Sequence, residues 1–217
     1  MNVIPEDTFR NHFFWRDVKM LQQQVDKQSK TNYVVKIALL SAIATILMFI
    51  EFVVPVMPVF LKMDFSEVPV LLGAFALGPV SGIIIELVKN LVHVTSTITG
   101  GVGELANFLM GTAFVVPAGL IYKFKKNKKG ALLGLVIGIL SKTLVAVILN
   151  YYVLFPLYQK IFSLDALLEM SKKANPAIHD LKGIIILGII PFNLLKGFLV
   201  SLIIMLIYKK LSPLLHR

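Results

Sequence analysis

Runs of apolar residues follow one another along most of the chain, and short polar or glycine- and proline-rich segments separate them. A helix needs about 20 mostly apolar residues to cross the roughly 30 Å hydrocarbon layer of a bilayer. Gly78-Pro79 divides one long apolar region in two, because this residue pair favours a break in the helix. The pattern predicts six membrane-spanning helices, at residues 35–57, 68–78, 80–97, 104–122, 130–156 and 182–208.

The composition fits an all-α integral membrane protein. Of the 217 residues, 57% are hydrophobic and 16% are charged, and the mean hydropathy of +0.80 lies above that of soluble domains. Residues 1–33 are expected to form a polar tail, since they lack the apolar core of a signal peptide, and residues 34–217 the six-helix membrane domain. Cysteine is absent, which excludes disulfides and cysteine-bound metals.

Basic residues in the connecting segments predict the orientation in the membrane, because Lys and Arg are retained on the cytoplasmic side. The tail is mixed in charge but carries Arg10, Arg16, Lys19, Lys27 and Lys30, residues 123–129 (KFKKNKK) hold five lysines and no acid, and the chain ends KKLSPLLHR. Six spans place these three segments on one side, so both termini are expected in the cytoplasm. Basic residues in these segments contribute to the net charge of +10, so the charge gives no reason to expect a nucleic-acid partner.

Strongly polar side chains inside the predicted spans gather in the outer half of the membrane. Threading the spans at about 1.5 Å per residue gives these depths. The inner halves hold nothing stronger than Ser or Thr, apart from Lys142 near mid-depth. The candidates for a pocket are Lys89, Glu104, Asn107 and Asn150 in the outer halves and Asn193 and Lys196 at mid-depth; His93 also lies in an outer half, and Glu86 lies near the middle of its span.

Asn193 and Lys196 lie one helical turn apart in an otherwise apolar run, so they share a helix face. A central lysine costs about 2.5–3.5 kcal/mol on insertion scales, and an unpaired buried amide costs about 1–3 kcal/mol. Internal pairing is one interpretation, for example of Lys196 or Lys89 with Glu86. A pocket for a polar small molecule, open to the outside, is the interpretation we favour for the whole set.

Motifs of several enzyme classes are missing. The chain has no GxxxxGK[ST] loop for ATP, no HExxH metal site and no GxSxG nucleophile, so we do not expect it to hydrolyse ATP itself. His93 is expected to be a hydrogen-bonded core histidine rather than a metal ligand. Two alternatives stay open: a stand-alone secondary transporter, which should have polar inner halves, and an intramembrane lipid enzyme using Glu86 and Glu104.

Four ordered runs carry a resemblance to a known family: MDFSEVPVLLGAFALGPVSG (63–82), IELVKNLVH (85–93), GELANFLMG (103–111) and NLLKG (193–197). With six spans, cytoplasmic termini and the AxxxA pair Ala38 and Ala42, the chain resembles the S components of energy-coupling factor (ECF) vitamin transporters. The nearest resemblance is to the riboflavin-binding S component, over residues 34–210. The tail and the segment 157–181 are longer than in that family.

The resemblance implies a non-enzymatic, multi-pass plasma-membrane subunit without a cofactor or metal of its own. It would capture riboflavin, with FMN as a second candidate ligand, and dock on a transmembrane coupling protein with two ATPase subunits. An S component for another vitamin is the alternative. Ala38 and Ala42 would meet the coupling protein, while the loop after the first helix would cap the ligand. The implied ligand residues are Asn193, Lys196 and Asn150 at the ring edge, Glu104 and Asn107 nearby, Lys89, and Phe65 for stacking.

Overall fold

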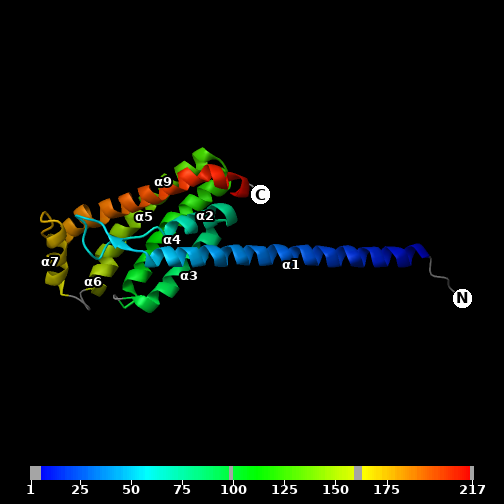
Figure 1. Ribbon diagram of the computed structural model, residues 1–217, viewed down its shortest axis with the longest axis horizontal. Coiled ribbons are helices and arrows are strands. Elements are labelled where there is room, and N and C mark those ends of the chain that lie inside the picture. The colour runs from blue at the N-terminus through cyan, green and yellow to red at the C-terminus, as the bar shows by residue number, and fades with distance from the viewer. Residues whose placement is uncertain (1–5, 98–99, 159–162, 216–217) are drawn as a thin grey trace. The chain divides into compact units, whose positions relative to one another are not determined.

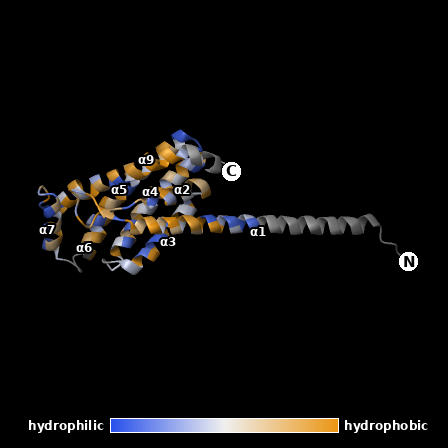
Figure 2. Ribbon diagram, viewed as in Figure 1, coloured by the Kyte–Doolittle hydropathy of each residue, from blue (hydrophilic) through white to orange (hydrophobic). Residues whose placement is uncertain are grey.

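The computed structural model describes residues 6–97, 100–158 and 163–215, and the chain divides into two compact units, Met1–Lys36 and Ile37–Arg217. The described part of the first unit is one continuous helical stretch, the beginning of α1 (Glu6–Phe49). In the coloured part of α1, Figure 2 shows a change from hydrophilic to hydrophobic residues toward the C-terminal end of the helix. The described residues of the predicted tail, 6–33, are therefore helical.

In the second unit, the described residues form helices and one two-stranded hairpin, joined by turns and irregular segments (Figure 1). Strand β1 (Phe52–Val53) pairs antiparallel with β2 (Lys62–Met63), with Phe52 opposite Met63. The helices that follow are α2 (Glu67–Leu77), α3 (Pro79–His93), α4 (Val102–Phe124), α5 (Lys128–Leu149), α6 (Phe155–Tyr158), α7 (Leu164–Ala174), α8 (Leu181–Gly183) and α9 (Ile190–Leu215).

Four helical segments in the described residues are long and apolar enough to cross a membrane: Gln28–Phe49, Val102–Phe124, Lys128–Leu157 and Leu181–Tyr208. Helices α2 and α3 are shorter, with 11 and 15 residues. The predicted break between them is confirmed. Gly78 adopts a φ of 100°, which favours glycine, and Pro79 takes the first position of α3, where its missing N–H is not needed.

The first predicted span is wrong over residues 50–57, because α1 ends at Phe49. Pro55 and Pro58 disfavour helical backbone in the residues that precede them, and Val56 adopts a positive φ of 69°. The apolar residues of this stretch form a hairpin and a turn instead of two more helical turns. The hairpin brings Lys62, Asp64 and Phe65 back toward the helices.

The long segment 157–181 contains the helix α7, which the sequence analysis did not predict. The hydroxyl of Ser163 caps α7 by accepting a hydrogen bond from the backbone N–H of Ala166, and Lys172 and Lys173 occupy its last turn. Leu167 and Ser171 are buried on one side of the helix. This amphipathic helix therefore packs on the unit and is not an open loop.

Two of the long apolar segments contain π-helical turns, at Asn150–Leu154 after α5 and at Ile184–Ile189 before α9. π-Helical turns are rare overall, and those that occur are often found at functional sites. Here each one lies next to a predicted ligand residue, since Asn150 opens the first turn and Asn193 follows the second.

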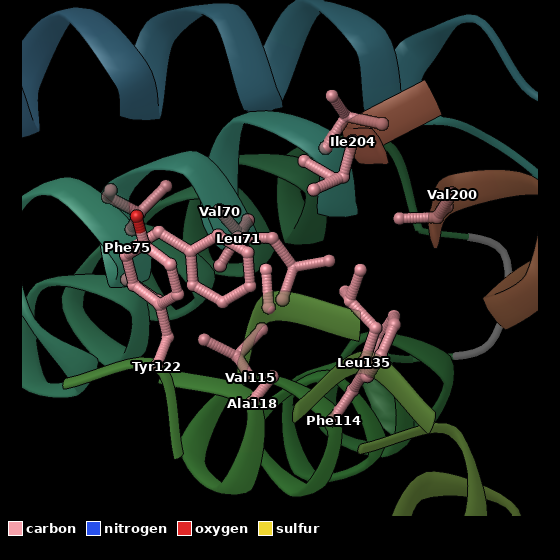
Figure 3. Close-up of a cluster of buried hydrophobic side chains, with 14 of the residues drawn as sticks. Val70, Leu71, Phe75, Phe114, Val115, Ala118, Tyr122, Leu135, Val200 and Ile204 are labelled. Carbon is pink, nitrogen blue, oxygen red and sulfur yellow. The ribbon is translucent and has the colours of Figure 1, made fainter. Parts of the chain in front are cut away.

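The main core lies between α2, α4, α5 and α9, as the labelled side chains of Figure 3 show. Phe75 of α2 stacks on Tyr122 of α4 with ring centroids 4.5 Å apart. Helices α4 and α5 approach closely at Gly138 because this residue has no side chain. A Cβ atom there would collide with Phe114. This tight packing leaves the end of the unit near the hairpin and α7 as the place where cavities remain.

Candidate functional site

A first cavity opens among the hairpin loop, the start of α2, and helices α4, α5 and α9, and its volume, with the open solvent at its mouth included, is about 650 Å³. Its wall combines apolar and aromatic side chains with amides and charged groups. The lining residues are Phe60, Leu61, Lys62, Glu67, Gly103, Ala106, Asn107, Met110, Lys142, Asn150, Leu154, Phe192, Asn193 and Lys196.

Asn150 and Asn193, both predicted ligand residues, lie together on this cavity. Each is buried, and each donates one amide N–H to a backbone carbonyl of the preceding turn: Asn150 Nδ2 to Ala146 at 2.7 Å and Asn193 Nδ2 to Ile189 at 2.9 Å. This bond fixes the side-chain orientation. A side-chain amide has one further N–H and a carbonyl oxygen, so both residues keep hydrogen-bonding capacity for a ligand.

Lys196 also lines the cavity, and its ammonium pairs with the carboxylate of Asp64 at 2.6 Å. Asp64 lies just after β2 and accepts a second hydrogen bond from the backbone N–H of Ser66 at 2.8 Å. Burial alone would raise the pKa of the Asp64 carboxyl, but the ammonium groups of Lys196 and Lys89 outweigh it and hold the pKa well below its usual range. Asp64 is therefore ionised, and it fixes the lysine beside the cavity.

Glu67 and Lys142 form a second buried ion pair on the same cavity. Glu67 is the first residue of α2, and Lys142 lies in α5, so the pair joins two helices. The sequence analysis singled out Lys142 as the one strongly polar residue outside the outer half, yet it did not predict a role for it. Asp64 and Glu67 were missed as site residues, although both stand in the DFSE run that carried the family resemblance.

A second cavity, with a volume of about 1090 Å³ when the open solvent at its mouth is included, lies beside the first and shares Phe60, Lys62, Gly103 and Asn107 with it. Glu104 lines it and accepts hydrogen bonds from Thr97 at 2.8 Å and from His93, whose Nδ1 lies 3.0 Å from the carboxylate. The expectation of a hydrogen-bonded His93 is thus confirmed. The other lining residues are Met48, Glu51, Val59, Asp64, Ser96, Leu167 and Met170.

Two predicted ligand residues, Lys89 and Phe65, line neither cavity. Lys89 is fully buried, pairs with Glu86 at 2.9 Å and donates to the Ser66 hydroxyl at 2.8 Å. The internal-pairing interpretation therefore describes Lys89, whereas Lys196 pairs with Asp64 and not with Glu86. Phe65 is half-buried, and its ring lies 6.3 Å from that of Phe52 in the hairpin.

Ala38 and Ala42 are exposed on α1, within the second unit. Ser41, which lies between them, and Ala44, which follows them, are buried. The small residues therefore form an outward face that another helix could approach closely. Among the described residues, no group of three His, Cys, Asp or Glu side chains could hold a metal ion.

Residues 32–208 match the family described as "ECF transporter, substrate-specific component". The chain belongs to this family. The S component fold is shared with a solved structure described as "Structure and mechanism of the S component of a bacterial ECF transporter", at a TM-score of 0.70 and 40% identity, covering 87% of this chain and 99% of that one.

Two curated relatives of this S component are each named as a riboflavin transporter. The riboflavin transporter RibU of Staphylococcus aureus (strain TCH60) is 44% identical over 183 residues, which are 84% of this chain and 92% of that protein. The riboflavin transporter FmnP of Bacillus subtilis (strain 168) is 34% identical over 189 residues, 85% of this chain and 94% of that protein. The family expected from the sequence is confirmed, and the protein is a multi-pass membrane component of a transporter rather than an enzyme.

Proposed function

We propose that this S component binds riboflavin and delivers it to an ECF-type importer. The observation that carries the proposal is the first cavity, where Asn150, Asn193 and Lys196 meet as expected for the riboflavin-binding members of the family. Relatives at 44% and 34% identity are named riboflavin transporters. The three residues come from α9 and the π-helical turn after α5, so the fold, not the sequence neighbourhood, brings Asn150 to the other two.

The first cavity suits the isoalloxazine ring of a flavin. The ring is flat and largely apolar, and Phe60 and Phe192 offer aromatic faces on the cavity wall. Its edge carries carbonyl acceptors and one imide N–H donor. Asn150 and Asn193 can both donate and accept, and Lys196 can donate, so the wall can satisfy both kinds of ring atom.

The second cavity suits the ribityl chain. The two cavities share Asn107 and Lys62, so one ligand can occupy both, with the ring in the first and the hydroxylated chain in the second. Glu104 and Asn107 would then bond hydroxyl groups. FMN, which adds a phosphate to this chain, is a second candidate ligand.

The orientation in the membrane is part of the proposal. With α2 and α3 counted as two spans, the chain crosses six times, and the basic segment 123–129 lies on the same side as both termini. That side is the cytoplasm by the positive-inside rule. The cavities, near the hairpin and α7, then face the outside, where the vitamin is captured.

The partners follow from family membership. An ECF S component works with a shared module of one transmembrane coupling protein and two ATPase subunits. The exposed face of Ala38 and Ala42 is the proposed contact with the coupling protein, because small residues allow close helix approach.

Titration of riboflavin into the purified protein tests the proposed site. Replacing Asn193 by Leu removes an amide from the cavity, and we expect riboflavin to bind about 10-fold or more weakly. Asn90→Leu is a matched control, because Asn90 is also buried and donates to a carbonyl one turn earlier, at 2.8 Å, yet lines neither cavity. Equal affinity in wild type and Asn193→Leu would remove Asn193 from the site.

A further inference from the structure

The segment that joins α4 to α5 carries a dense positive charge. Residues 123–129 (KFKKNKK) hold five lysines and no acid, and all seven residues are exposed. The sequence of α5 and α9 contains no Asp or Glu, and the acid of α4, Glu104, lies in its first turn, at the opposite end of that helix. These three helices therefore offer the lysines no carboxylate partner.

The lysines are held on a short, well-defined turn. Helix α4 ends at Phe124 and α5 begins at Lys128. The side chain of Asn127 caps α5 by accepting a hydrogen bond from the backbone N–H of Gly130 at 2.8 Å. The carbonyl of Lys125 accepts from the backbone N–H of Asn127, also at 2.8 Å, and a Cβ atom at Gly130 would collide with this carbonyl. The positions of the charges are thus set by the fold.

Helix stability does not explain two of these lysines. Lys128 and Lys129 occupy the first turn of α5, and no acidic residue accompanies them there. Cations are favourable near the C-terminus of a helix and unfavourable near its N-terminus, because the helix dipole is positive at that end. Lysines that disfavour their own helix indicate a negatively charged partner outside the unit.

An apolar surface adjoins the lysines. Phe124, which stands among them in the sequence, is 82% exposed, and Leu120, one turn earlier on α4, is exposed as well. On α5, Leu132 and Leu133 are exposed one turn after the lysines. Exposed apolar side chains on membrane-spanning helices face lipid. The charged turn therefore lies at the boundary between the hydrocarbon layer and the headgroups.

The last turns of α9 bring further basic residues to the same end of the unit. The hydroxyl groups of Tyr122 and Tyr208 lie 3.2 Å apart, so the end of α4 lies beside this part of α9. Lys209 and Lys210 follow Tyr208 directly in the sequence. Two basic segments that are far apart in the chain thus lie at one end of the fold.

We propose that this end of the unit binds negatively charged phospholipid headgroups of the cytoplasmic leaflet. The lysine ammonium groups donate to phosphate oxygens, and Phe124 and the neighbouring leucines contact the acyl chains. An acidic protein surface would account for the lysines but not for the apolar surface beside them. The inference rests on the proposed orientation in the membrane and does not involve the riboflavin site.

Lipid binding by the purified full-length protein in detergent tests the inference. Native mass spectrometry measures the lipid bound as phosphatidylglycerol, which is anionic, or phosphatidylcholine, which has no net charge, is titrated into the protein. Each lysine near anionic lipid strengthens binding about 5-fold. We expect wild type to bind phosphatidylglycerol more tightly than phosphatidylcholine. The triple variant Lys125→Gln/Lys128→Gln/Lys129→Gln should bind phosphatidylglycerol on the order of 10- to 100-fold more weakly than wild type.

Lys172→Gln/Lys173→Gln/Lys182→Gln is the matched control. It also removes three exposed lysines, but from α7 and α8, in a stretch that carries acidic residues. This variant should bind phosphatidylglycerol as wild type does. The inference is overturned by three results: no preference for phosphatidylglycerol in wild type, an unchanged affinity in the first variant, or an equal loss in both variants. Weaker co-purification of the first variant with the coupling module, at unchanged lipid affinity, would assign the lysines to a protein partner instead.

Two measurements separate this inference from the proposed function. Both triple variants should bind riboflavin with wild-type affinity, and a wild type that binds no riboflavin overturns the proposed ligand alone. The chain has no cysteine, so Lys128→Cys introduces a single thiol into the turn. This thiol should react with a membrane-impermeant maleimide only after intact cells are permeabilised. Reaction from outside intact cells overturns the cytoplasmic orientation and the lipid contact with it.

Discussion

Substitutions in the ion pair between Lys196 and Asp64 distinguish its effect on stability from its effect on ligand binding. Both side chains are 5% exposed, and their charged atoms lie 2.6 Å apart. Lys196→Met leaves the Asp64 carboxylate buried, with the backbone N–H of Ser66 and the electrostatic effect of Lys89 but without the ammonium that bonds it directly. The double variant Lys196→Met/Asp64→Asn removes both charges and keeps the side-chain volumes close to those of wild type.

The two variants should differ in stability by several kcal/mol. Removing one partner of a buried pair costs about 3–5 kcal/mol, because an uncompensated charge stays in a medium of low polarity. Replacing both partners is often neutral. Both variants lack the ammonium that we propose to bond the flavin, and that loss weakens binding by about 10- to 100-fold.

Thermal unfolding in detergent and titration with riboflavin measure the two effects. We expect Lys196→Met to melt well below wild type and the double variant to melt close to it, while the double variant still binds riboflavin weakly. Wild-type affinity in the double variant would refute the contact between Lys196 and the ligand. Wild-type stability of Lys196→Met would refute the argument from the buried pair.

Three further results are expected. The depressed pKa of Asp64 adds stability that is fully present above its ordinary pKa of 3.8 and is lost as the pH falls below it, so the melting temperature should fall from pH 6 to pH 3 by more in wild type than in Asp64→Asn. Ala42→Leu should weaken co-purification with the coupling module and leave riboflavin affinity unchanged, whereas Leu132→Phe, at an exposed position of α5, should weaken neither co-purification nor affinity; normal co-purification of Ala42→Leu would remove this face from the interface. Lys89→Met should lower the melting temperature, because it strands Glu86, and leave the riboflavin affinity of the folded protein unchanged; a loss of affinity would place Lys89 at the ligand.

The helices could be predicted because each apolar run carries its own signal. The break at Gly78-Pro79 and the cores of α4, α5 and α9 follow directly from local sequence. The end of α1 could not be predicted from hydropathy, since residues 50–57 are as apolar as a helix, and only their prolines and the pairing with β2 distinguish them. Helix α7 was missed because its polar side dilutes the hydropathy on which the assignment relied.

The candidate site could be predicted in part, because some of its residues are polar exceptions within apolar runs. Asn193 and Lys196 stand out in an apolar run, and Asn150 does so in another. Their partners could not be predicted, because Asp64 lies 132 positions from Lys196, and Glu67 lies 75 positions from Lys142. Contacts over such distances depend on how the helices pack. Lys89 was placed at the ligand for the same reason as Lys196, and only its contacts distinguish the two residues.

The visible absorption spectrum of the protein, purified in detergent from cells grown with riboflavin, tests the central claim most directly. The proposed function predicts a yellow protein with a flavin spectrum and about one flavin per chain. A colourless protein that also fails to quench the fluorescence of added riboflavin would contradict it, and would direct attention to the other vitamins that S components could carry.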